Sequence, residues 1–309
     1  MPRKRHDVLI VGAGPAGLST ALWVRDFGFE AVLLERERQP GGQLHQIHAP
    51  IANYLTAFGW NGDRFAGVAL ADARTAELNI LVGEPVKRIS ARELRVDRGR
   101  ERYRARAIVL ATGLRRRALG VRGEAELLGR GVSHSANRDR QRFADRPVAV
   151  VGGGTAAVED ALLCAATGSP VTLIHRSTRF RARNDFLERA RADPKIRFVT
   201  NSEVVAIVGK ERVEAVRYRK RGSRRIEEAR VDAVFVRIGW EPDTGVARGV
   251  VRLDRAGFVR VGPGGRTSAR GVYAAGDVCS PRCPSIANSV GQGAEVAWEI
   301  ARELGRIRG

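Results

Sequence analysis

Cysteine is scarce in this chain of 309 residues, which contains only Cys164, Cys279 and Cys283. Three cysteines are too few for a disulfide scaffold or a zinc ribbon, so both are excluded and no metal site is expected. No apolar run approaches the roughly 20 residues of a membrane-spanning helix. The basic start is not followed by the long apolar region of a secretory signal. We therefore expect a soluble, cytoplasmic protein without membrane contact.

Acidic residues and lysine are also in short supply. The 54 basic residues outnumber 34 acidic ones and give a net charge of +20, and all but five of the basic residues are arginine. Such an excess either decorates a solvated surface or steers the protein toward an acidic partner, such as a small electron-carrier protein. Nucleic acid is disfavoured as a partner, because no motif of a nucleic-acid-binding module accompanies the basic segment 217–225.

A glycine-rich turn, in contrast, occurs twice. The first copy is Gly12-Ala13-Gly14-Pro15-Ala16-Gly17 and the second is Gly152-Gly153-Gly154-Thr155-Ala156-Ala157. Each copy follows a short apolar, β-branched run and opens a helical stretch, which is the context in which such a turn binds a dinucleotide pyrophosphate. The first glycine allows the tight turn, the second lets the backbone approach the phosphates, and the third position lets helix and strand pack closely.

The two copies differ at the position that selects the nucleotide. The strand after the first turn ends at Glu35, whose carboxylate can accept hydrogen bonds from free ribose hydroxyls. The strand after the second turn ends at His175, which is followed by Arg176, Arg179 and Arg181, cations that suit a 2′-phosphate. The pair of sites predicts FAD together with NADP(H), and that combination indicates an oxidoreductase.

The order of the motifs predicts an α/β fold with two interleaved Rossmann-like domains. Further apolar strands end in small residues at 107–113, 234–239 and 271–277, and a long helix is expected from about Ser285. We expect an FAD-binding domain of residues 1–118 and 245–309. An NAD(P)H-binding domain of residues 119–244 is expected to be inserted into it.

The chain resembles the low-molecular-weight thioredoxin reductase family, class II of the pyridine nucleotide-disulfide oxidoreductases. The resemblance rests on seven motifs in the same order over almost the whole chain: Gly12–Gly17, Gly41-Gly42-Gln43, Ala111-Thr112-Gly113, Gly152–Ala157, His175-Arg176, Ile238-Gly239 and Ala275-Gly276-Asp277. It implies two interleaved, three-layer nucleotide-binding domains. It also implies hydride transfer from NADPH to FAD and on to an acceptor, and a homodimer.

The resemblance also implies which residues bind each cofactor. Those expected to contact FAD are Gly12, Gly14, Pro15, Ala16, Glu35, Arg36, Gly42, Gln43, Asn53, Ala111, Thr112, Gly113, Gly276, Asp277, Ser285 and Ile286. Those expected to contact NADP(H) are Gly152, Gly154, Thr155, Ala156, His175, Arg176, Arg181, Ile238 and Gly239. The family's second phosphate-binding arginine is replaced by Ser177, so NADPH is favoured over NADH only moderately and NADH use stays open.

The chain departs from the family at its redox centre. Thioredoxin reductases have Cys-Ala-Thr-Cys-Asp where this chain has Ser135-Ala136-Asn137-Arg138-Asp139. A hydroxyl and a guanidinium cannot cycle between dithiol and disulfide. The sequence therefore predicts a reductase that lacks the CxxC pair and is not a conventional thioredoxin reductase.

The electron acceptor is left open by the sequence. Ferredoxin or flavodoxin is the first candidate, because the thioredoxin-reductase-like ferredoxin–NADP reductases also lack the cysteine pair. The alternatives are a low-molecular-weight disulfide or a quinone, or a non-catalytic sensor that binds flavin and nucleotide. We assign no catalytic side chain with the exception of Cys279 and Cys283, which could form a replacement redox pair or could be packing thiols in a crowded loop.

Overall fold

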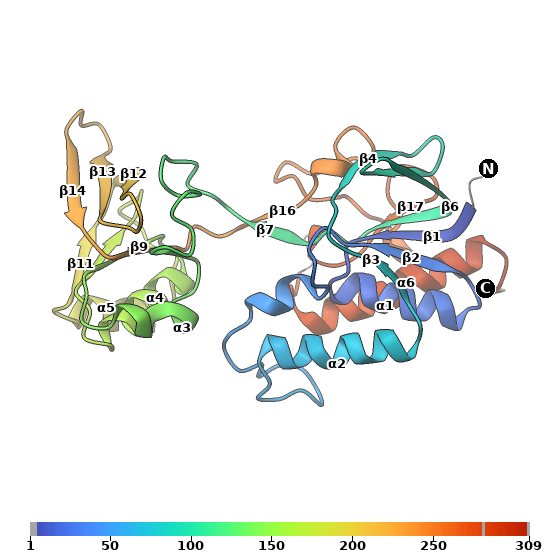
Figure 1. Cartoon of the computed structure of the whole chain (residues 1–309), viewed down its shortest axis with the longest axis horizontal. Helices are drawn as coiled ribbons and strands as arrows, with labels where there is room; N and C mark the ends of the chain where they lie inside the picture. Colours follow the sequence, from blue (N-terminus) through green and yellow to red (C-terminus); the bar gives the residue numbers. More distant parts are fainter. Residues whose placement is uncertain (1–4, 280–281, 308–309) are drawn as a thin grey trace. The chain divides into compact units, whose positions relative to one another are not determined.

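The structure is a computed structural model that describes residues 5–279 and 282–307. The chain forms two compact units (Figure 1): unit 1 comprises Met1–Arg115 and Glu241–Gly309, and unit 2 comprises Arg116–Trp240. The sequence predicts domain boundaries after residues 118 and 244, which are three and four residues further along the chain than the boundaries between these units. The chain passes between the units in strands β7 (Leu114–Arg116) and β16 (Trp240–Pro242), which pair as a two-stranded sheet.

Unit 1 is built on a mixed sheet with the strand order β3-β2-β1-β6-β5-β4, and β17 pairs with the end of β6. Strands β1, β2, β3, β6 and β17 are parallel, whereas β4 and β5 extend the sheet in antiparallel fashion. The strand bounds are β1 Arg5–Val11, β2 Ala31–Leu34, β3 Asn79–Leu81, β4 Val86–Ser90, β5 Arg95–Arg98, β6 Glu101–Leu110 and β17 Val272–Ala274. The apolar runs in β1, β2 and β6 are buried because parallel strands are covered on both faces.

Three helices cover one face of this sheet: α1 (Pro15–Asp26), α2 (Gly62–Thr75) and α6 (Ile286–Glu303) (Figure 1). Helices α1 and α6 share one apolar core with the sheet. The opposite face is covered by a second core, in which residues 246–259 pack on the strands. Ser285 caps α6 by accepting a hydrogen bond from the backbone N–H of Asn288 at 3.2 Å, so the helix begins where its sequence pattern predicts.

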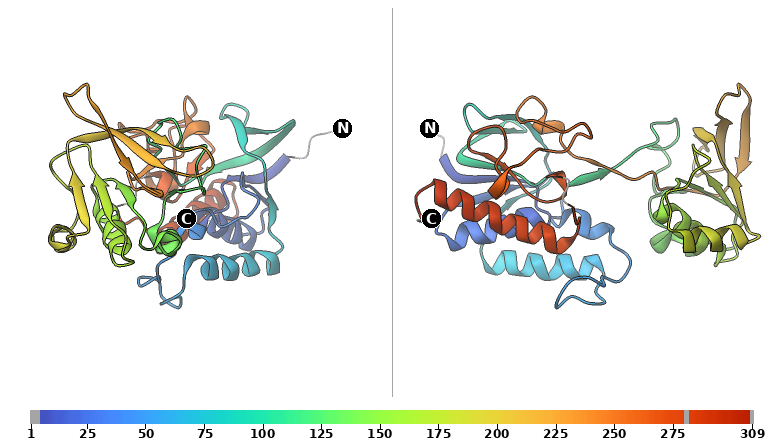
Figure 2. Two further views of the ribbon diagram at one scale, coloured as in Figure 1. Left: turned by 60° about the vertical axis from the view of Figure 1, so that its left-hand side comes forward. Right: turned by 180° about the vertical axis from the view of Figure 1, so that it is seen from behind.

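Figure 2 shows the chain from two further sides. Unit 2 has an all-parallel sheet in the order β11-β10-β9-β15-β8. Its strands are β8 Val132–Ser133, β9 Val148–Val151, β10 Val171–Ile174, β11 Ile196–Val199 and β15 Ala233–Val236. Helices α3 (Ala136–Asp139), α4 (Thr155–Ala165) and α5 (Asn184–Ala192) pack on one face. The antiparallel sheet of β12 (Ser202–Val208), β13 (Ala215–Lys220) and β14 (Ile226–Arg230) packs on the other. Each unit thus has the layered α/β architecture that the sequence predicts.

Short 3₁₀ turns complete the described parts of the chain: η1 Gly42–Gln46, η2 Arg140–Phe143, η3 Gly245–Ala247, η4 Pro263–Gly265 and η5 Asp277–Cys279. Within residues 5–279 and 282–307, no helix combines the length and apolar character that crossing a membrane requires.

Candidate functional site

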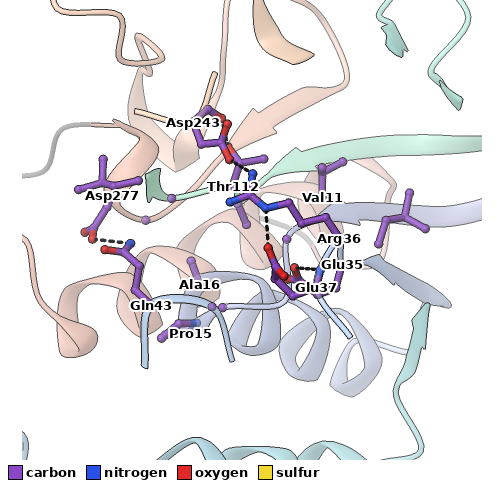
Figure 3. A pocket seen from close by; sticks show the side chains of 18 of the residues that line it. Val11, Pro15, Ala16, Glu35, Arg36, Glu37, Gln43, Thr112, Asp243 and Asp277 are labelled. Carbon is purple, nitrogen blue, oxygen red and sulfur yellow. Dashed lines mark hydrogen bonds and ion pairs between the residues drawn. The ribbon is translucent and has the colours of Figure 1, made fainter. Parts of the chain in front are cut away.

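A cavity of about 780 Å³ opens in unit 1 where the parallel strands end (Figure 3). Gly12 follows β1, Glu35 follows β2, Thr112 lies just beyond β6 and Asp277 lies just beyond β17. The carboxyl ends of parallel strands meet at one edge of a sheet, so these four motifs converge although they are far apart in the sequence. The volume is in the range of pockets that hold organic cofactors.

The three glycines of the first turn have different surroundings. Gly12 has φ +107°, and a Cβ there would collide with the carbonyl oxygen of Ala111. A Cβ on Gly17 would collide with the carbonyl oxygen of Gly12, so this glycine allows α1 to pack against the turn. Gly14 lines the cavity, and a Cβ there would meet no atom within 4 Å. The backbone at Gly14 is therefore accessible, as it must be for a pyrophosphate to approach.

The carboxylate of Glu35 is fixed beside this turn. Its side chain accepts hydrogen bonds from the backbone N–H groups of Ala13 at 2.8 Å and Glu37 at 3.0 Å, and the residue is only 6% exposed. In Figure 3 it lies beside Arg36, which forms an ion pair with Asp243. A carboxylate held in this way retains lone pairs for ribose hydroxyls.

The other end of the cavity contains polar atoms without protein partners. Gln43 donates a hydrogen bond to Oδ2 of Asp277 at 3.3 Å, whereas the buried Oδ1 of Asp277 has no hydrogen-bond partner. Outside the cavity lining, the buried Nδ2 of Asn288, in the first turn of α6, also has none. Burial raises the pKa of Asp277, and the bond from Gln43 lowers it again in part. Buried polar groups are normally satisfied, so the free oxygen of Asp277 fits a polar cofactor such as FAD.

The structure brings most of the residues expected to contact FAD to this cavity: Gly12, Gly14, Pro15, Ala16, Glu35, Arg36, Gly42, Gln43, Ala111, Thr112, Gly113, Gly276 and Asp277. Asn53, Ser285 and Ile286 do not line it. Asn53 is exposed, and Ser285 is occupied as the cap of α6. The sequence did not single out Asp243 and Ser289, which also line the cavity. Asp243 accepts a hydrogen bond from the Thr112 hydroxyl through its backbone carbonyl, at 2.6 Å.

A second cavity, of about 540 Å³, opens in unit 2 at the end of β9. It is lined by all nine residues expected to contact NADP(H): Gly152, Gly154, Thr155, Ala156, His175, Arg176, Arg181, Ile238 and Gly239. Gly152 has φ +151°, and a Cβ there would collide with the carbonyl oxygen of Arg237. Gly154, like Gly14 in unit 1, has open space where a Cβ would be. The two turns therefore share one geometry.

The role of His175 in this cavity differs from that of the neighbouring arginines. Its ring lies against Gly153, at 4.8 Å from the ring of Phe180, and its Nε2 is 3.2 Å from the carbonyl oxygen of Arg179. Burial lowers the pKa of His175, and the charges of Arg176 and Arg181 lower it further, against the bond to Arg179. The imidazole is thus uncharged at neutral pH, and the two arginines supply the positive charge expected for a 2′-phosphate site.

The segment that replaces the family's cysteine pair forms α3 and its cap. Ser135 accepts a hydrogen bond from the backbone N–H of Arg138 at 3.4 Å. Arg138 forms a bidentate ion pair with Asp139, at 3.0 and 2.8 Å. Burial alone would raise the pKa of Asp139, but the hydrogen bonds from Arg138 and Ser133 hold it below its ordinary value. This carboxylate is ionised at neutral pH, so it is not a ready proton donor.

None of the three cysteines belongs to residues 135–139. Cys164 is buried on α4, and burial raises its pKa to about 12. Burial also raises the pKa of Cys279 to about 12, whereas Cys283 is exposed. Residues 280–281, between them, lie outside the described residues. At neutral pH Cys279 is a protonated thiol and hence a poor nucleophile. Within the described part of the chain, no group of three His, Cys, Asp or Glu side chains could hold a metal ion.

Comparison with known proteins decides the family. The model of the pyridine nucleotide-disulphide oxidoreductases matches residues 6–293. The chain belongs to this family. The thioredoxin reductase of Mycolicibacterium smegmatis is 37% identical over 97% of this chain and 96% of its own. The crystal structure of Lactococcus lactis thioredoxin reductase has a TM-score of 0.82 at 28% identity, covering 98% of this chain and 100% of that one.

A more distant neighbour has the same fold. The bacillithiol disulfide reductase of Bacillus cereus has a TM-score of 0.78 at 20% identity, over 97% of this chain and 100% of that one. The predicted family, α/β fold class and enzyme class are thereby confirmed: the chain is an oxidoreductase of the thioredoxin reductase-like type, a family that uses FAD and NADPH.

Proposed function

We propose that this enzyme oxidises NADPH and passes the electrons, through FAD, to an external acceptor without an intermediate protein dithiol. The observation that carries this proposal is the occupancy of positions 135 and 138 by a hydroxyl and a guanidinium, in a chain that otherwise keeps the family's nucleotide motifs. Arg138 forms a bidentate ion pair with Asp139, and Ser135 caps α3, so both side chains have structural contacts in this segment.

The cavity of unit 1 is proposed as the FAD site, so that unit 1 is the FAD-binding domain. The bare backbone at Gly14 and the start of α1 would receive the pyrophosphate, since helix N-termini attract phosphates. Glu35 would accept hydrogen bonds from the adenosine ribose. The unsatisfied oxygen of Asp277 would bind polar groups toward the flavin end. When bound, FAD supplies the ring that accepts a hydride and later releases its electrons.

The cavity of unit 2 is proposed as the NADP(H) site, so that unit 2 is the NAD(P)H-binding domain. Gly154 and the N-terminus of α4 would receive the pyrophosphate. Arg176 and Arg181 would bind the 2′-phosphate, which NADH lacks. We therefore propose NADPH as the preferred donor and NADH as a slower one.

A small acidic electron carrier, ferredoxin or flavodoxin, is the acceptor we propose. The net charge of +20 supports an acidic protein partner, and one-electron carriers need no thiol in the path. A route through Cys279 and Cys283 to a small disulfide is less well supported, because the half-buried Cys279 thiol is protonated at neutral pH. The homodimer expected from the family likeness and the cytoplasmic location expected from the sequence are retained as predictions.

Anaerobic titration of the purified protein tests this function. NADPH is expected to bleach the flavin absorbance stoichiometrically, and NADH is expected to do so more slowly. The reduced enzyme should then reduce ferredoxin but not thioredoxin. A protein that binds no flavin, or that reduces thioredoxin as fast as its relatives do, would contradict the proposal. Bleaching by NADPH with no turnover on any acceptor would instead favour the nucleotide sensor.

A further inference from the structure

The 2′-phosphate half of the unit 2 cavity reaches the antiparallel sheet. Arg176 and Arg181 line this half, whereas Ser177, the next residue after Arg176, does not line the cavity and carries no charge. Ser202 and Glu203, the first two residues of β12, line the cavity as well. One wall of the site is therefore the edge of the sheet formed by β12, β13 and β14.

Backbone hydrogen bonds join this wall to the tip of the β13–β14 hairpin. The N–H of Asn201 donates to the carbonyl oxygen of Ser177 at 3.5 Å, and the N–H of Arg221 donates to the carbonyl oxygen of Asn201 at 2.7 Å. Asn201 has φ +52°, a left-handed conformation that asparagine tolerates better than most residues. Arg221 is thus two backbone hydrogen bonds away from the neighbour of Arg176.

Arg219 starts at the same wall. In the pairing of β12 with β13, Arg219 is directly opposite Glu203, and Lys220 is opposite Ser202. Directly opposite residues share one face of a sheet, with Cβ atoms about 4.5–5.5 Å apart. Because Glu203 lines the cavity, the side chain of Arg219 begins at the rim of the site. We call Arg219 and Arg221 the rim arginines.

The acids near this rim leave an excess of positive charge. In the described part of the chain, neither rim arginine forms an ion pair, and both are exposed. Among the described residues that line the cavity, Glu203 is the acid, and it can offset one cation. Glu227 is on β14, which β13 separates from the cavity wall. Three further acids have partners of their own: Asp185 with Arg183, Glu227 with Tyr218 and Glu228 with Arg217.

We propose that the rim arginines extend the 2′-phosphate site and strengthen the preference for NADP(H) over NAD(H). A phosphate monoester carries a charge of about −1.5 to −2 at pH 7, and NAD(H) lacks this group. Ser177 contributes no charge beside Arg176, and the hairpin tip supplies cations across the rim instead. The inference rests on the proposed function, because it assumes NADP(H) in this cavity. It assigns Arg219 and Arg221 as specificity-determining residues.

Equilibrium binding to the complete, oxidised, flavin-loaded enzyme tests the inference without turnover. NADP⁺ and NAD⁺ are compared by calorimetry, because they differ only in the 2′-phosphate. At about 0.05 M ionic strength, Arg219→Gln and Arg221→Gln are each expected to weaken NADP⁺ binding about threefold, and the double variant about tenfold. NAD⁺ binding should not change. At about 0.5 M the losses should become smaller, because exposed charges are screened.

A matched control separates the local charge effect from a loss of net charge. Arg212→Gln removes an exposed arginine at the opposite end of the β12–β13 hairpin and should leave both affinities unchanged. Wild-type NADP⁺ affinity in the double variant, or equal losses for NADP⁺ and NAD⁺, would overturn the inference alone. Failure of the wild-type enzyme to bind either dinucleotide would overturn the proposed function as well.

Discussion

The glycines of the first turn illustrate how one residue type performs separable tasks. Gly14 faces the cavity and has open space around it, whereas Gly17 lies against the backbone of Gly12. A methyl group at Gly14 would thus obstruct a ligand, and a methyl group at Gly17 would obstruct the fold itself. Two substitutions of the same size can therefore distinguish binding from folding.

We predict that Gly14→Ala lowers FAD content while leaving the thermal stability of the flavin-free protein nearly unchanged. Gly17→Ala should destabilise the flavin-free protein by about 1–3 kcal/mol, because the added Cβ forces helix and turn apart. The ratio of flavin to protein absorbance, with thermal unfolding after flavin removal, measures both effects. Full FAD content in Gly14→Ala would mean that this turn does not receive the pyrophosphate.

Asp160 provides a prediction about pH. Burial raises its pKa to about 6 in the folded protein, above the value of about 3.9 for an exposed carboxyl. The folded state therefore binds more protons than the unfolded state between these values. The contribution of Asp160 to stability is greatest at acidic pH and falls as the pH rises from about 4 to about 6.

Asp160→Asn removes this titration and is the matched comparison. We expect the unfolding free energy of the variant, relative to the wild type, to increase by about 2–3 kcal/mol between pH 4 and pH 7. Urea unfolding at a series of pH values measures the difference. A difference that instead decreases with pH would show that the ion pair with Arg237 outweighs burial.

At the scale of elements, the contact between α1 and α6 holds unit 1 together beneath the cavity. Ser19 on α1 donates a hydrogen bond to the carbonyl oxygen of Val290 on α6 at 2.7 Å. A Cβ on Gly293 would lie 2.6 Å from the carbonyl oxygen of Ala16, so the helices can approach closely only because this residue is glycine. Gly291, one half-turn earlier, has no neighbour within 4 Å of such a Cβ.

These two glycines of α6 predict opposite effects. Gly291→Ala should stabilise the protein by about 0.5–1 kcal/mol, because alanine has the higher helix propensity and no contact opposes it. Gly293→Ala should destabilise the protein and weaken FAD binding, since α1 must move away from α6. Thermal unfolding and flavin content of the two variants check this. Equal stabilisation by both would show that the helices are not closely packed at Gly293.

At the scale of the whole molecule, the excess of arginine predicts a dependence on salt. Attraction between exposed charges is screened over about 10 Å at 0.1 M ionic strength. If the positive surface steers an acidic carrier, the second-order rate of ferredoxin reduction should fall several-fold as the salt concentration rises from 0.05 to 0.5 M. Reduction of an uncharged quinone is the control and should change little. Equal salt dependence for both acceptors would mean that the net charge does not steer the partner.

Local signals in the sequence were sufficient to predict those residues of the two cavities that directly follow strands. The two glycine turns, Glu35 and the arginines after β10 each lie at the end of a short apolar run, and a run of that kind predicts its own strand. Helix α2 was not predicted, because its surface is mixed and only a narrow stripe is buried. Asn53 and Ser285, assigned through family likeness, lie outside the cavity lining because a loop and a helix cap set their positions.

The sequence by itself determined that the glycine-rich turn occurs twice, that different charged residues follow the two copies, and that no cysteine pair stands at 135 and 138. Only the tertiary structure decided which distant residues complete each cavity. It brought Asp243 beside Arg36 in unit 1, and Arg116 and Arg237 to the cavity in unit 2. The reason is physical: a turn is encoded by neighbouring residues, whereas a cavity wall depends on strand order, which joins residues a hundred or more positions apart.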